Sequence, residues 1–67
     1  MSLVVLASTS HAAEKARAWL CREGFAAEAG VVGGASFVIV GGEGIDAAVA
    51  LRLARDADPG CRPVTAW

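Results

Sequence analysis

The chain has 67 residues, of which 55% are hydrophobic, and six basic against seven acidic side chains give a net charge of −1. Its basic residues are dispersed among acidic ones, whereas a nucleic-acid binder usually gathers positive charge in a patch that neutralises phosphates. No run approaches the roughly 20 apolar residues that cross a bilayer. The composition therefore disfavours nucleic-acid and membrane partners. It indicates one small domain, 1–67, with more apolar surface than a small core can bury.

A continuous aliphatic run over residues 3–7 predicts the first strand, and such runs are typical of central strands that are covered on both faces. The hydroxyl residues 8–10 can then cap a helix. Apolar residues recur at helical spacing over 11–23, and Gly24 supplies a stop signal. We therefore predict a helix over 11–23.

Two β-rich segments, 25–32 and 35–40, flank Gly33 and Gly34. A Gly-Gly pair in this position predicts a two-residue hairpin, because the favoured turn needs a positive φ at both residues. The turn also fixes the register of the two strands. The expected pairs are Val32 with Ala35, Gly30 with Phe37, Ala29 with Val38, and Glu28 with Ile39.

The glycine-rich segment 41–44 breaks the chain before a second predicted helix over 45–57, which the turn residues 58–60 end. The last segment, 61–67, is predicted to be a strand. Because Pro63 cannot donate to a strand ladder, this strand belongs at a sheet edge.

The predicted element order is therefore β-α-β-β-α-β. With right-handed crossovers, this order gives an α+β fold of the ferredoxin-like type, in which two helices cover one face of a four-stranded antiparallel sheet. The expected strand order is 4-1-3-2, with the apolar first and third strands in the centre.

Two segments carry a resemblance to known families. Residues 13–25 resemble the first helix and following turn of the SPOR domain of bacterial cell-division proteins, and residues 37–41 resemble its third strand and the glycine after it. The layout is also similar to that of small bacterial domains assigned to signal transduction. The resemblance implies the same fold. It does not carry SPOR glycan binding to this chain, because Val5 and Ile39 occupy positions that are typically polar on the glycan-binding face.

Three patterns could carry chemistry. His11 near Ser8 and Ser10 suggests a hydrolase, but no orienting carboxylate or oxyanion hole is evident. The segment 41–44 could hold an anion at a helix start, but it lacks the P-loop lysine, and neighbouring acidic residues oppose an anion. Cys21 lies near two arginines and could be a reactive thiol. We expect no catalytic residue, no cofactor and no metal site.

The two cysteines, Cys21 and Cys61, lack metal-type spacing, and residues 2–7 lack the features of a secretory leader. We therefore expect a cytoplasmic protein with both thiols reduced. A Cys21–Cys61 disulfide is the alternative.

Apolar surface is the remaining signal. If Glu28 lies on the uncovered face of the predicted sheet, the hairpin register places three apolar residues beside it: Val32, Phe37 and Ile39. Alternation in the first strand, with Val4 and Leu6 taken as core residues, adds Leu3 and Val5 to that face. A contiguous apolar patch on a small protein usually marks an interface.

The second predicted helix is apolar nearly all round. With Val49 and Leu53 facing the sheet, Ala54 and Leu51 lie on its outer side beside two arginines. The full predicted interface combines this outer strip with the sheet face and the C-terminal tryptophan: Leu3, Val5, Val32, Phe37, Ile39, Leu51, Arg52, Arg55 and Trp67.

These features predict a non-catalytic protein–protein interaction module. It would be a small regulator or inhibitor, bacterial or phage-type, that acts through its apolar sheet face as a homodimer or on a larger protein complex. The alternative is a regulatory domain that resembles ACT-type sensors, with a small ligand held near residues 41–44. An enzyme that uses His11 with Ser8 or Ser10 is the third hypothesis.

Overall fold

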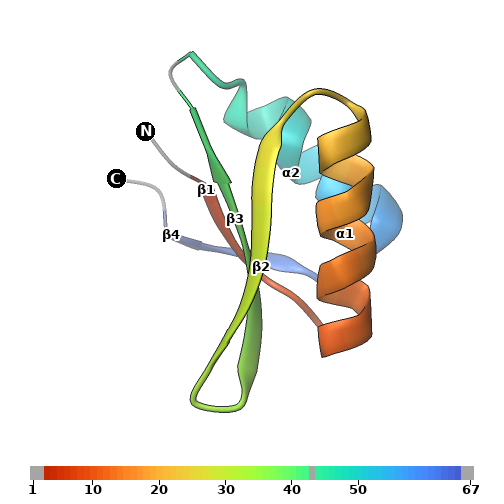
Figure 1. Ribbon diagram of the computed structural model, residues 1–67, viewed down its shortest axis with the longest axis vertical. Coiled ribbons are helices and arrows are strands. Elements are labelled where there is room, and N and C mark those ends of the chain that lie inside the picture. The colour runs from red at the N-terminus through yellow and green to blue at the C-terminus, as the bar shows by residue number, and fades with distance from the viewer. Residues whose placement is uncertain (1–2, 43, 66–67) are drawn as a thin grey trace.

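The computed structural model describes residues 3–42 and 44–65. Its elements are β1 (Leu3–Leu6), α1 (Ser10–Arg22), β2 (Ala26–Val32), β3 (Ala35–Gly41), α2 (Ala47–Ala57) and β4 (Arg62–Thr65). The strands form one antiparallel sheet in the order β2-β3-β1-β4, and both helices lie on the same face of it (Figure 1). The predicted ferredoxin-like α+β fold and its strand order are confirmed.

The β2–β3 hairpin has the predicted turn and register. Gly33 and Gly34 adopt φ values of 58° and 82°, a region that glycine enters without the penalty a Cβ would bring. The strands pair without a register shift from Ala26 opposite Gly41 to Val32 opposite Ala35. Since side chains alternate between faces along a strand, this register settles which hairpin residues face the helices.

Side-chain caps decide where the helices begin. The Thr9 hydroxyl accepts a hydrogen bond from the Ala12 amide at 3.0 Å, so α1 begins at Ser10. The Asp46 carboxylate accepts from the amides of Ala48 and Val49 at 3.1 and 3.2 Å, and α2 begins at Ala47. The predicted start of this helix at residue 45 is therefore two residues early. The difference arises because Asp46 keeps an extended backbone in order to cap the first turn.

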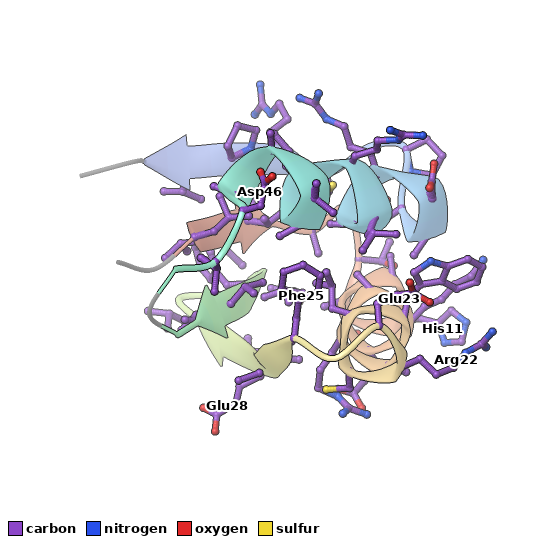
Figure 2. All side chains as sticks on the ribbon, turned by 90° about the horizontal axis from the view of Figure 1, so that it is seen from above. His11, Arg22, Glu23, Phe25, Glu28 and Asp46 are labelled. Atoms are coloured by element: carbon purple, nitrogen blue, oxygen red, sulfur yellow. The ribbon has the colours of Figure 1, made fainter. Side chains whose placement is uncertain are left out.

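The core lies between the sheet and the helices and is built from small side chains. Leu20, Val5, Val38 and Val40 are its largest fully buried members. The helices contribute mostly alanine: Ala13, Ala16, Ala50, Ala54 and Ala57 are all buried. Short side chains let the helix axes approach the sheet and each other closely. Phe25, in the turn after α1, fills part of the space between the two layers (Figure 2).

One buried carboxylate joins the two loops at the same end of the sheet. Asp58, just after α2, accepts hydrogen bonds from the Ser8 hydroxyl at 2.6 Å, the Ser8 amide at 2.9 Å and the Gly60 amide at 3.2 Å. Burial by itself raises the pKa of the Asp58 carboxyl, but these three donors outweigh it and hold the pKa below its ordinary value. The bonds tie the loop after β1 to the turn that leads into β4.

We expect Asp58→Ala to lower the free energy of unfolding by about 1–3 kcal/mol, because the Ser8 and Gly60 donors lose their acceptor in a partly buried site. Urea denaturation measures the change. Asp56→Ala is the matched control, since Asp56 is exposed two residues earlier, and its effect should stay within about 0.5 kcal/mol. Equal losses in the two variants would contradict the assignment.

The lowered pKa of Asp58 also predicts acid sensitivity. A carboxyl with a lower pKa in the folded chain contributes stability that is complete above its unfolded pKa, about 3.9. That stability is lost as the pH falls through the folded pKa. The unfolding free energy of the wild type should therefore fall as the pH drops below about 5. Asp58→Asn should flatten this dependence, and an unchanged pH profile in that variant would contradict the prediction.

Candidate functional site

The side of the sheet opposite the helices carries a row of apolar side chains. We call it the open face, and its residues are Val4, Leu6, Glu28, Gly30, Val32, Phe37 and Ile39. Strand pairing brings these residues together, because Ile39 lies opposite Val4 on one side and Glu28 on the other, while Phe37 lies between Leu6 and Gly30. Glu28 points away from the helices (Figure 2).

Much of the open face is accessible. Val32 is 72% exposed and Ile39 is 45% exposed, although neither side chain is polar. A shallow hollow of about 280 Å³ lies among them, lined by Val4, Gly30, Val32, Phe37 and Ile39. Gly30 helps to form the hollow, because a Cβ placed there would meet no atom within 4 Å. The lining offers hydrocarbon contacts and no side-chain hydrogen-bonding group.

Val32, Phe37 and Ile39 therefore lie on the open face as predicted, and their role in binding remains a prediction. Trp67, also in the predicted interface, lies outside the described residues. Pro63 lies in the edge strand β4, as predicted.

The predicted orientation of the first strand is wrong. Leu3 and Val5, which were expected on the open face, are 5% and 0% exposed and belong to the core. Their partners across β1 and β3 are the core residues Val40 and Val38. An all-aliphatic strand carries no polar residue to mark its outer face. Alternation alone therefore allows either Leu3 and Val5 or Val4 and Leu6 to face the core. Only the β1–β3 register distinguishes them.

The predicted orientation of α2 is wrong in part: Leu53 packs against the core as expected, but Ala54 and Val49 do not lie where they were expected. Ala54, expected on the outer side, is fully buried, while Val49, expected against the sheet, is 42% exposed. Leu51 is half-buried against the core, and Arg52 and Arg55 are exposed. The alanines face inward because the helix packs closely against the core. When a helix is apolar nearly all round, its sequence pattern does not show which side faces the core. The outer side of α2 is thus more charged than predicted.

The possible hydrolase residues are not brought together as a catalytic set. The Ser8 hydroxyl donates its hydrogen bond to Asp58 rather than to an imidazole. His11 is exposed on the side of α1 away from the sheet (Figure 2). A hydroxyl that donates to a carboxylate in this way lacks the base-and-orienter geometry of a nucleophile.

The start of α2 does not offer a free anion site in its first turn. The amides of Ala48 and Val49 already donate to the Asp46 carboxylate. An incoming anion would have to displace this charge, which the helix dipole favours at the same position. Within the described residues there is also no group of three His, Cys, Asp or Glu side chains that could hold a metal ion.

The two cysteines are free thiols in different environments. Cys21 is exposed, and its thiol donates to the Ala27 carbonyl at 3.6 Å. Cys61 is buried, and its pKa is raised by burial and by the nearby charge of Asp58. The reactive thiolate form is therefore disfavoured at Cys61.

No family model, curated protein or solved structure matches this chain. Across the part of the chain that the structure describes, no helix has the length and apolar character needed to span a membrane. A functional proposal therefore depends on the fold and on the open face.

We expect a thiol reagent such as a disulfide-containing chromophore to modify Cys21 rapidly in the folded protein and Cys61 only after unfolding. The raised pKa and the burial of Cys61 both slow its reaction. Absorbance at neutral pH, with and without denaturant, measures the two rates. Cys21→Ser should abolish the fast phase, and a fast phase that persists in this variant would contradict the prediction.

Proposed function

We propose that the protein is a non-catalytic protein–protein interaction module, a small regulator or inhibitor that binds an apolar surface of a partner through its open face. The observation that supports this proposal most directly is the hollow, whose lining is wholly apolar and open to solvent. Contiguous apolar surface on a small domain is costly to leave in water and usually marks a binding site.

The energetics favour a macromolecular partner. Burying a large aliphatic or aromatic side chain contributes about 1.5–3 kcal/mol, so covering Val32, Phe37 and Ile39 together supplies a useful share of a binding free energy. A strand-built surface with a shallow apolar hollow suits a partner with a complementary convex apolar patch. Because Glu28 is exposed beside Ile39, a basic side chain at the rim of that patch would be favoured.

The outer side of α2 takes a secondary place in this proposal. Arg52 and Arg55 are exposed there, but Leu51 packs partly against the core. This side can add charge to an interface, whereas the open face supplies the apolar area. A partner that spans both surfaces would have to reach around the edge strand β4.

We expect Ile39→Asp to abolish partner binding while the fold persists, because Ile39 is nearly half exposed and its replacement puts a second carboxylate beside Glu28. The matched control is Val49→Asp, which introduces the same charge at a similarly exposed position on α2. Affinity capture from an extract of the source organism uses the immobilised wild type and both variants. Circular dichroism verifies that each variant is folded.

The proposal requires a protein that wild type and Val49→Asp retain in near-equimolar amount and that Ile39→Asp does not. The purified protein must then bind the wild type at least tenfold more tightly than Ile39→Asp. Equal retention by all three forms would place the binding surface elsewhere. Binding of a small metabolite that raises the melting temperature equally in wild type and Ile39→Asp would instead support the ligand-sensor hypothesis.

A further inference from the structure

The two edges of the sheet differ in how they are protected. The β4 edge is four residues long, contains Pro63 and has an irregular register opposite Val4 and Val5. Such features prevent another strand from pairing. The β2 edge is seven residues long, pairs regularly with β3 along its whole length and contains no proline. Proline, short length and an irregular register therefore protect the β4 edge and not the β2 edge.

Valines are exposed on both sides of β2. Val31 is 64% exposed on the helix side, and Val32 is 72% exposed on the open face. These are neighbouring residues, so their side chains point to opposite faces of the sheet. A partner lying on the open face would cover Val32 and leave Val31 in water. A partner that docks along the strand edge can cover both.

The end of the hairpin lies beyond the helix layer, past the N-terminal end of α1 (Figure 1). At this end a second hollow of about 170 Å³ lies between α1 and the sheet, and Ala29, Val31 and Ser36 line it together with the first turns of the helix. Closer to the start of β2, the Cys21 thiol bonds to the Ala27 carbonyl, so α1 already occupies part of that backbone. The accessible edge is therefore residues 29–32.

We propose that residues 30–32 of β2 pair antiparallel with residues 30–32 of a second copy of this chain, around a two-fold axis at Val31. The two sheets of four strands then form one continuous sheet, with all helices on one side and both open faces on the other. This inference deepens the proposed function and rests on it for its biological meaning, because it doubles the apolar surface offered to a partner.

The β2 edge is complementary to itself, and this favours a second copy of the chain as its partner. When Val31 lies opposite its own copy, Val32 of each chain lies opposite Gly30 of the other. The absent side chain at Gly30, where a Cβ would meet nothing within 4 Å, leaves room for that valine at the edge of the hollow. Each Glu28 then lies six residues along the strand from its copy, about 20 Å away, so the two carboxylates do not repel strongly.

Two variants test the pairing. Val31→Lys places two like charges opposite each other, and Gly30→Val fills the space that Val32 of the second copy would take. Gly30 has an ordinary strand backbone and an unobstructed Cβ position, so Gly30→Val should fold at least as well as the wild type. Because each change enters a two-fold interface twice, each should weaken the dimer by about tenfold or more. Val49→Lys, on α2, is the charge-matched control.

Sedimentation equilibrium measures the result. The wild type and Val49→Lys should have twice the chain mass of 6.8 kDa at high micromolar concentration, and both edge variants should shift toward the monomer. Hydrogen exchange should slow with concentration at the Val31 amide, because alternate residues of β2 direct their N–H groups away from β3, and it should not slow at the amides of β4. If Val31→Lys fails to fold, Gly30→Val and the hydrogen-exchange pattern still show whether the β2 edges pair.

Ile39→Asp separates this inference from the proposed function, because it should abolish partner binding and leave the dimer intact. A wild type that stays monomeric at millimolar concentration would overturn the inference without touching the partner experiment. A dimer that Ile39→Asp breaks and that Val31→Lys and Gly30→Val leave intact would also overturn it, and would show that two open faces pack together instead.

Discussion

The structure depends on one constraint: a sheet has two faces, and this chain has helices for only one of them. Both helices pack on the same side (Figure 1), and their contact surface is made mostly of alanine. That surface brings the layers close together but leaves room for few large side chains. The largest fully buried side chains of the core are therefore only Val5, Val38, Val40 and Leu20. Val32, Phe37 and Ile39 of the hairpin are then left on the other side. The open face is a direct result of this two-layer architecture.

The sequence predicts this arrangement only where a residue shows which face of an element turns outward or which strand lies at an edge. Gly33 and Gly34 mark the hairpin, and Glu28 marks its outer face, so the register and the orientation of Phe37 and Ile39 follow from local rules. Pro63 marks the edge strand in the same way. The first strand contains no such marker, and neither Leu3 nor Val5 could be oriented without the β1–β3 register. In α2 the inward position of Ala54 reflects the distance between layers, which is a tertiary property.

The site itself was partly predictable for the same reason. The open face and three of its apolar members follow from the hairpin, but the hollow does not, because it arises where Gly30 lies beside residues of three strands. The exposure of Val31 does not follow from strand alternation alone. Alternation assigns it to the helix side, and only the structure shows that α1 leaves 64% of it exposed there. A signal was present in the pair Val31-Val32, since two neighbouring valines at the end of an edge strand cannot both face a core.

The bond between Ser8 and Asp58 also bears on the order in which the chain folds. It joins residues that are 50 positions apart, whereas the β2–β3 hairpin closes across two residues. Loop closure over the longer distance costs more conformational entropy, so we expect the hairpin to form before the contact between Ser8 and Asp58. An interaction that is absent from the transition state slows unfolding and leaves the folding rate unchanged. The Asp58 carboxylate is thus placed to lengthen the lifetime of the folded state.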